Sequence, residues 1–151
     1  MDQITKMLVS GIFCDGVRGT NLNKIITITD WDPDRMQLVF GDGDEFLKNF
    51  TGTVDVIGHE LTHAVTDAMA PLLYFGQSGA LNEHISDVFG IIVKQRKEKE
   101  SAEEADWLIG EGCLVPGVKG IALRSMKDPG TAYDDPRFVR QPLFCPKAKD
   151  C

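Results

Sequence analysis

Residues 59 to 63 of the chain read His-Glu-Leu-Thr-His, which places two imidazoles four positions apart and a carboxylate directly after the first. If this stretch is helical, His59 and His63 project side by side and can together bind one Zn²⁺ ion. Glu60 then lies about 100° round the helix, where it can hold a water without being a ligand. Zinc lowers the pKa of such a water to about 7, so Glu60 can take its proton as the water attacks a carbonyl. The alternative is a structural histidine pair on a buried helix.

A third ligand is predicted in the next apolar segment, Ser-Gly-Ala-Leu-Asn-Glu-His-Ile-Ser-Asp-Val-Phe-Gly. Glu83 stands there among residues that we expect to be buried, and a buried carboxylate is costly unless it is paired or binds a metal. Asp87, one helical turn on, faces the same way and can accept a hydrogen bond from the second nitrogen of a ligand histidine. The alternative is a solvent-facing acidic stripe.

Two helices must hold these side chains. In the first, apolar residues recur at three- and four-residue steps, which predicts a buried stripe; Thr51 or Thr53 is the expected N-cap and Pro71 marks the end. The residues of this predicted stripe are Val54, Ile57, Leu61, Ala64, Val65 and Ala68. A second helix is expected from about residue 79 to 97, with Ser78 as its cap. Its predicted apolar face consists of Leu81, Ile85, Val88, Phe89, Ile92 and Val93.

The segments around the helices predict a fold of class α+β. Residues 24–29 and 36–40 are typical of strands, with turn residues at 32–34 between them, so a small β-hairpin region comes first. The mixed-charge stretch after residue 93 is expected in solvent. Beyond Asp106 the chain is rich in glycine and proline and is predicted to be mostly loop.

Composition limits the partners. The chain has 151 residues, enough for one domain with its own core, and a net charge of −7, which argues against a nucleic-acid partner. No apolar run approaches the roughly 20 residues that a membrane span needs, and the first residues are a poor secretory signal. The acidic residues at 30–45 are interpreted as a solvated loop, with a cation site as the alternative. The four cysteines lack a C-x-x-C spacing; Cys145 and Cys151 could form a disulfide, which the sequence leaves undecided.

The motifs at 55–67, 78–90 and 123–138, in that order, resemble the thermolysin-like metallopeptidases of the M4 family, and most closely its protealysin-like members. The resemblance implies a metalloendopeptidase that uses one zinc ion per chain and cuts peptides on the amino side of bulky apolar residues. It assigns roles as follows: zinc ligands His59, His63 and Glu83; general base Glu60; oxyanion donor Tyr74; orienting partners Asn82 and Asp87; substrate-binding Arg124. Family members are largely secreted.

The same resemblance predicts an incomplete enzyme. It assigns residues 1–50 to a remnant of a β-rich lobe, 51–138 to the zinc-binding core and 139–151 to an unstructured or atypical tail, with the chain truncated at both ends. We expect the apolar face of the second helix to be uncovered, at Ile92 and Val93, and to favour self-association.

Three departures concern function. No histidine remains for a second oxyanion donor, because His84 points about 100° away from Glu83. Of the substrate-gripping strand at 28–31 only Trp31 matches. The family's calcium site would correspond to Asp55, Asp106 and Glu111 with an acid at Lys94, so calcium is not expected, and Lys94 is predicted to bind Asp55 or Asp106 instead. The alternative function is an inactive zinc-binding fragment or pseudoenzyme.

Overall fold

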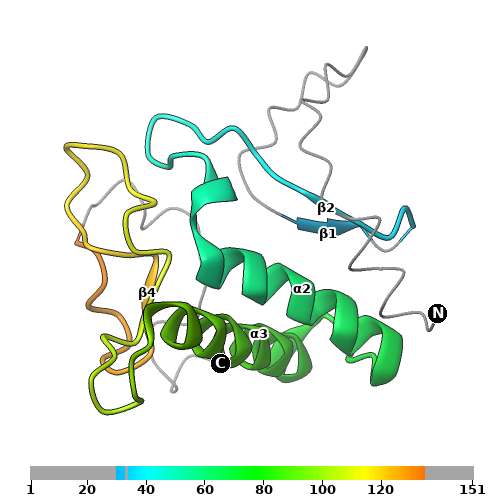
Figure 1. The fold of residues 1–151 in the computed structure, drawn as a ribbon. Helices are drawn as coiled ribbons and strands as arrows, with labels where there is room; N and C mark the ends of the chain where they lie inside the picture. Colours follow the sequence, from blue (N-terminus) through cyan, green and yellow to red (C-terminus); the bar gives the residue numbers. More distant parts are fainter. Residues whose placement is uncertain (1–29, 33, 135–151) are drawn as a thin grey trace.

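The computed structural model describes residues 30–32 and 34–134 (Figure 1). Its elements, in chain order, are β1 (Asp30–Asp32), β2 (Gln37–Val39), the 3₁₀ helix η1 (Phe50–Gly52), α2 (Val54–Met69), α3 (Gly76–Glu98), β3 (Leu108–Ile109) and β4 (Arg124–Ser125). The predicted combination of a small hairpin, two helices and a loop-rich segment is confirmed. The strand expected at 24–29 lies outside the described residues; β2 pairs with β1 instead, with Trp31 opposite Leu38.

The long helices α2 and α3 pack against each other and form the centre of the described structure (Figure 1). Two glycines allow their backbones to approach closely. A Cβ on Gly58 would lie 3.1 Å from the Cα of Gly90, and a Cβ on Gly90 would lie 2.5 Å from the carbonyl oxygen of Asp55. Because neither glycine has a side chain, the two backbones approach closely here, and polar groups on the facing sides of the helices come within hydrogen-bonding reach.

The buried side of each helix differs from the predicted one. The buried residues of α2 are Asp55, Val56, Gly58, His59, Glu60, Thr62 and Ala64. Those of α3 are Gly79, Asn82, Ser86, Asp87, Gly90, Ile91 and Lys94. The residues of the predicted stripes that are instead exposed are Val65 and Ala68 on α2 and Leu81, Phe89, Ile92 and Val93 on α3. The physical reason is that the polar residues of the two helices satisfy each other's hydrogen bonds, which allows a largely polar interface to be buried.

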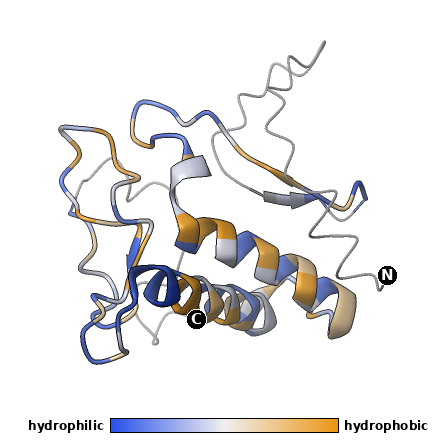
Figure 2. Ribbon diagram, in the orientation of Figure 1, coloured by the Kyte–Doolittle hydropathy of each residue, from blue (hydrophilic) through white to orange (hydrophobic). Residues whose placement is uncertain are grey.

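The exposed apolar face of α3 was expected at Ile92 and Val93, and both side chains are indeed more than a third exposed. Apolar residues recur along both helices, whereas the end of α3 nearest β4 is hydrophilic (Figure 2). Self-association through this face stays a prediction. Neither described helix is long and apolar enough to cross a membrane.

The helix ends agree only in part with prediction. Thr53 is the N-cap residue of α2, although its side chain makes no capping hydrogen bond, and α2 ends two residues before Pro71. The second helix starts at Gly76 with Phe75 as N-cap, so Ser78 lies inside it rather than before it. The Ser78 hydroxyl donates to the carbonyl oxygens of Leu73 and Phe75. Because the Ser78 hydroxyl bonds to these preceding carbonyl oxygens, it does not cap the start of the helix, although serine is a common N-cap residue.

The segment after α3 contains a small ladder of two strands and packs against η1 and α2 through an apolar cluster. β3 and β4 are antiparallel, with Leu108 opposite Ser125 and Ile109 opposite Arg124. The cluster consists of Phe50, Val56 and Cys113, with Phe40, Leu47 and Leu123 packed against it. This arrangement brings β4 to the side of α3, as Figure 1 shows.

Candidate metal centre

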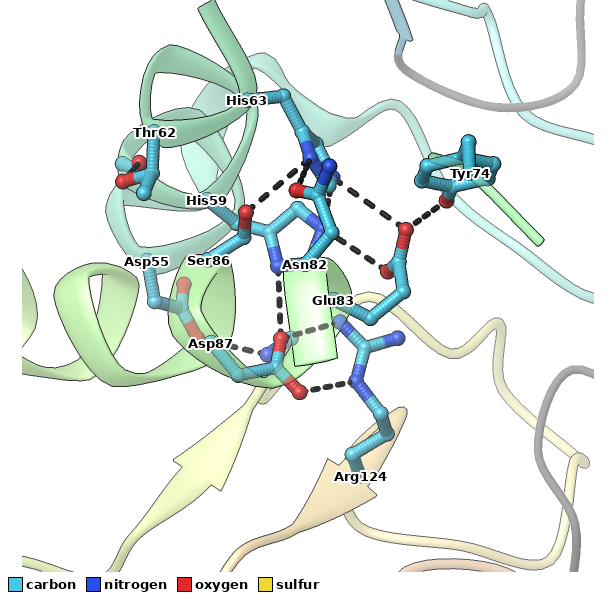
Figure 3. A network of polar contacts seen from close by, with 12 residues as sticks. Asp55, His59, Thr62, His63, Tyr74, Asn82, Glu83, Ser86, Asp87 and Arg124 are labelled. Atoms are coloured by element: carbon cyan, nitrogen blue, oxygen red, sulfur yellow. Dashed lines mark hydrogen bonds and ion pairs between the residues drawn. The ribbon is translucent and has the colours of Figure 1, made fainter. Parts of the chain in front are cut away.

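Two imidazoles and a carboxylate converge between α2 and α3 (Figure 3). The Nε2 atoms of His59 and His63 lie 2.9 Å apart. The Glu83 carboxylate reaches across from α3, with one oxygen 3.3 Å from His59 Nε2 and the other 3.4 Å from His63 Nε2. One donor atom from each of the three residues lies within 4.8 Å of the others. The residues singled out as ligands are therefore brought together.

The other nitrogen of each imidazole is held by α3. Nδ1 of His59 lies 2.7 Å from Asp87 Oδ1, and Nδ1 of His63 lies 2.9 Å from Asn82 Oδ1. A carboxylate can only accept, so Nδ1 of His59 is the donor and its Nε2 faces Glu83. The partners predicted for the two histidines are thus in contact with them.

Ser86 belongs to the same network and was missed in the sequence. Its hydroxyl is 3.1 Å from Nδ1 of His63, and the residue is fully buried. The signal available in the sequence was its spacing, because Asn82 and Ser86 are four positions apart on one helix face.

The donor set fits a zinc ion. Zinc takes imidazole nitrogens and carboxylate oxygens, typically with tetrahedral geometry and three protein ligands at catalytic sites. At bond lengths of about 2.0–2.1 Å, two tetrahedral ligands lie roughly 3.3 Å apart. The two histidine–glutamate distances match that spacing, and the two imidazoles need to separate by only a few tenths of an ångström.

The site charges one histidine and keeps both carboxyls ionised. Burial disfavours a charge on His59, but hydrogen bonds with Asp87 and Glu83 outweigh it and raise the pKa of His59 to about 9. Burial acts against the ionised forms of Glu83 and Asp87 as well. The hydrogen bond from His59 nevertheless lowers the pKa of each carboxyl, and for Asp87 the bond from Arg124 adds to this. Both acids are therefore available as anions to ligate or to orient.

Arg124 reaches this network from β4. Its Nε and a terminal nitrogen donate to the two oxygens of Asp87 over 2.7 and 2.6 Å, a bidentate pair. Burial opposes the guanidinium charge, but the Asp87 hydrogen bond raises the pKa of Arg124. The predicted substrate-binding arginine thus lies beside the centre, bound to the acid that orients His59.

Tyr74 and Glu60 complete the predicted constellation. Tyr74 lies in the loop between α2 and α3, is mostly exposed, and donates its hydroxyl to the Glu83 carboxylate (Figure 3). Its ring centroid is 6.1 Å from that of His63. Glu60 is buried on α2 next to His59. A phenolic donor and a carboxylate are therefore both adjacent to the ligands.

Lys94 lies in a second polar cluster, at the far end of α3. Its ammonium group is 2.9 Å from Asp106 and 3.0 Å from Glu111. Of the two partners predicted for it, Asp106 is the one observed; Asp55 instead accepts a hydrogen bond of 2.6 Å from the backbone N–H of Gly110. The expectation that this stretch lies in solvent is wrong for Lys94, which is 5% exposed. Its charge is compensated by two carboxylates, which makes burial affordable.

The structure also shows where some residues of the predicted departures from the family lie. His84 is exposed on α3, away from the buried network that holds Asn82 and Asp87. Trp31 lies in β1, whereas Ile28 and Thr29 lie outside the described residues. Cys145 and Cys151 also lie outside them.

Two helices that present a pair of imidazoles and a carboxylate to one point define a metal-binding helical core. A family model described as thermolysin metallopeptidase, alpha-helical domain, matches residues 70–149, and one described as thermolysin metallopeptidase, catalytic domain, matches residues 20–67. The chain belongs to the thermolysin metallopeptidase family, which confirms the resemblance drawn from the motifs.

Similar proteins cover most of this chain, but the chain covers little of them. Protease PrtS of Photorhabdus sp. (strain Az29) is 56% identical over 109 residues, which is 72% of this chain and 29% of that protein. Thermolysin of Alicyclobacillus acidocaldarius subsp. acidocaldarius is 52% identical over 101 residues, 66% of this chain and 18% of that protein. The structure of the precursor of protealysin, a metalloproteinase from Serratia proteamaculans, superposes with a TM-score of 0.70 at 55% identity, covering 75% of this chain and 35% of that one. The chain thus spans less than a third of these two curated relatives.

Proposed function

We propose that the chain carries the zinc centre of a metalloendopeptidase that hydrolyses peptide bonds. The observation behind this is the convergence of His59, His63 and Glu83 on one point while the far nitrogens of both imidazoles are hydrogen-bonded. Bound zinc, one ion per chain, would supply a Lewis acid and a water of pKa about 7.

Glu60, Tyr74 and Arg124 would then have separate roles in the reaction. Glu60 would take the proton of the attacking water and pass it to the leaving amine. Tyr74 would turn its hydroxyl from Glu83 to the oxygen of the scissile carbonyl as that oxygen gains charge. Arg124, fixed by Asp87, would bind a backbone carbonyl of the peptide. A substrate with a bulky apolar residue on the carboxyl side of the cut bond is the class expected from the family resemblance.

We also propose that Lys94 replaces a calcium ion. Its ammonium group has two carboxylates and the carbonyl oxygen of Leu108, at 3.4 Å, as neighbours, which are oxygen donors of the type that calcium prefers. A Lys94→Glu substitution would restore an acid there and should make thermal stability rise with added calcium. The unaltered chain should show no such rise; an equal rise in both would contradict the replacement.

A second function, zinc binding without turnover, is favoured by one observation. The chain has three histidines, two of them are the proposed ligands, and His84 is exposed on α3. Within these 151 residues no histidine is thus left as a second donor to the oxyanion, and removing one such donor typically costs about 10²–10³ in turnover.

One experiment separates the two functions. Zinc content is measured on the purified chain beside chelator-sensitive hydrolysis of casein, for the unaltered protein and for Glu60→Gln. Stoichiometric zinc in both, with hydrolysis only in the unaltered chain, supports the endopeptidase. Zinc without hydrolysis in either supports the binding function, and absence of zinc binding refutes both.

A further inference from the structure

The buried ammonium of Lys94 fixes the segment that follows α3. Asp106 receives bonds of 3.1 and 2.9 Å from Lys94 Nζ, and Glu111 one of 3.0 Å. Lys94 is on α3 and both acids are on the segment around β3, so these contacts join two elements. The lysine side chain is only 7% exposed, whereas the side chains of Asp106 and Glu111 are 37% and 54% exposed, so water reaches the two carboxylates but hardly the ammonium group.

The same acid holds the β3 backbone. Asp106 Oδ1 also accepts a hydrogen bond of 2.9 Å from the N–H of Leu108, the first residue of β3. Just beyond β3, the N–H of Gly110 donates to Asp55 of α2. Strand β3 and the residue after it are therefore held to both helices by hydrogen bonds between helix side chains and their backbone. Lys94 supplies the positive charge of this cluster.

Strand β3 in turn positions the arginine of the metal centre. Arg124 lies opposite Ile109 in the β3–β4 ladder. The backbone on either side of β4 is bonded as well: Leu123 donates to Ile109 over 2.9 Å and Met126 to Trp107 over 2.9 Å. The Cα of Arg124 is thus fixed from both sides by β3.

Arg124 completes the connection to the candidate ligand. It is bidentate to Asp87, whose Oδ1 is 2.7 Å from His59 Nδ1. Partners that orient a ligand histidine commonly change metal affinity by about 10- to 100-fold when removed. A displacement of Arg124 would therefore change the orientation of His59 through Asp87.

We infer that Lys94 is a positioning residue for the metal centre, acting through the β3–β4 ladder and Arg124 on Asp87 and His59. The inference rests on the proposed zinc site, but not on hydrolysis by the chain. The competing explanation is that Lys94 stabilises the fold and has no particular effect on the ligand. The two differ in whether the effect of Lys94 depends on Arg124.

The test is a double-mutant cycle on zinc affinity. The dissociation constant is measured by competition with a chromophoric chelator for the full chain and for Lys94→Met, Arg124→Met and the double variant, at a temperature where all are folded. Lys94→Arg serves as the conservative variant. Gly43→Ala controls for general loss of stability, because Gly43 has a positive φ, an added Cβ would clash with the carbonyl oxygen of Leu47, and neither residue lies on this route.

We expect Lys94→Met to weaken zinc binding about tenfold, with Lys94→Arg close to the unaltered chain and Gly43→Ala without effect. In the Arg124→Met background the loss from Lys94→Met should fall below about twofold. An unchanged dissociation constant in Lys94→Met, or the same loss in both backgrounds, would overturn the inference. If Lys94→Met does not fold, Asp106→Asn replaces it in the cycle with the same expectations.

A second readout separates this inference from the zinc site itself. The imidazole N–H proton of His59, hydrogen-bonded to Asp87, should give a downfield NMR resonance in the metal-free chain. We expect that resonance to be lost or broadened in Lys94→Met and retained in Gly43→Ala. If it is retained in Lys94→Met, the inference fails even where zinc binds; if it is lost there while the unaltered chain binds no zinc, only the proposed function fails.

Discussion

Asp87 is the residue whose replacement tests the metal centre most directly. It accepts three short hydrogen bonds, one from His59 and two from Arg124, and its side chain is 7% exposed. Asp87→Asn keeps the volume and one acceptor oxygen but removes the negative charge and presents an N–H group where an acceptor stood. The variant therefore disturbs the orientation of His59 without opening a cavity.

The magnitude follows from those bonds. Hydrogen bonds to charged groups contribute about 1.5–3 kcal/mol each, and the two from Arg124 are the ones that the amide cannot both keep. Arg124 is 27% exposed, so water replaces part of the loss, and we expect the free energy of unfolding to fall by about 2–3 kcal/mol. For zinc, loss of an orienting carboxylate should weaken binding about tenfold, or about 1.4 kcal/mol.

The assay is a zinc titration against a chromophoric chelator, with urea unfolding of the metal-free chain beside it. Asp67→Asn is the matched control, because Asp67 is an exposed aspartate on α2, the helix that carries both histidines. We expect the control to match the unaltered chain in both measurements. If Asp87→Asn binds zinc within about threefold of the unaltered chain, the orienting role of Asp87 is refuted.

Two further predictions concern packing and pH. Gly90→Ala should destabilise the chain by about 1–3 kcal/mol in urea unfolding, since its Cβ would lie 2.5 Å from the Asp55 carbonyl oxygen. Gly52→Ala is the control, because a Cβ there has no atom within 4 Å. Equal effects of the two substitutions would contradict the close helix crossing. For the Lys94–Asp106 pair, burial works against both charges. Hydrogen bonds from the Leu108 backbone N–H and then from Lys94 nevertheless lower the pKa of Asp106 from 3.8, and hydrogen bonds to Asp106 and Glu111 raise the pKa of Lys94 from 10.5. The stability that ionised Asp106 contributes is thus present above pH 3.8 and is lost as the pH falls through its lowered pKa. The stability that charged Lys94 contributes is present below pH 10.5 and is lost as the pH rises through its raised pKa. The difference in melting temperature between the unaltered chain and Lys94→Met should therefore be constant from about pH 5 to pH 9 and shrink on either side; a difference that changes within that window would contradict the ion pair.

The three candidate ligands could be identified from the sequence because their choice depends on spacing along single helices. His59 and His63 share a face at four positions, and so do Glu83 and Asp87, whatever the rest of the chain does. The exact orientation of Arg124 could not be obtained in the same way. Its position depends on the pairing of β3 with β4, two strands of two residues each, and such short strands leave no period to detect.

The buried faces were mispredicted for a related reason. Apolar periodicity identifies a stripe that can be buried, and both helices have one, but the contact between α2 and α3 uses the adjacent polar side. The clue lay in the small residues: Gly58 is one position from His59 on α2, and Gly90 is three positions from Asp87 on α3. Those glycines bring the backbones together where the network forms.

A polar interface of this kind is stable only when its polar groups are hydrogen-bonded to one another. Here the hydrogen bonds that satisfy the interface are also those that orient the proposed zinc ligands. Thr62 donates to the Gly58 carbonyl, Asn82 and Ser86 hold His63, and Asp87 holds His59. An apolar replacement of Asp87 would leave Nδ1 of His59 buried without this hydrogen bond, which costs about 1–3 kcal/mol. The helices are therefore held in register by the side chains that aim the imidazoles. Folding of this core and construction of its metal site are, on this argument, one process.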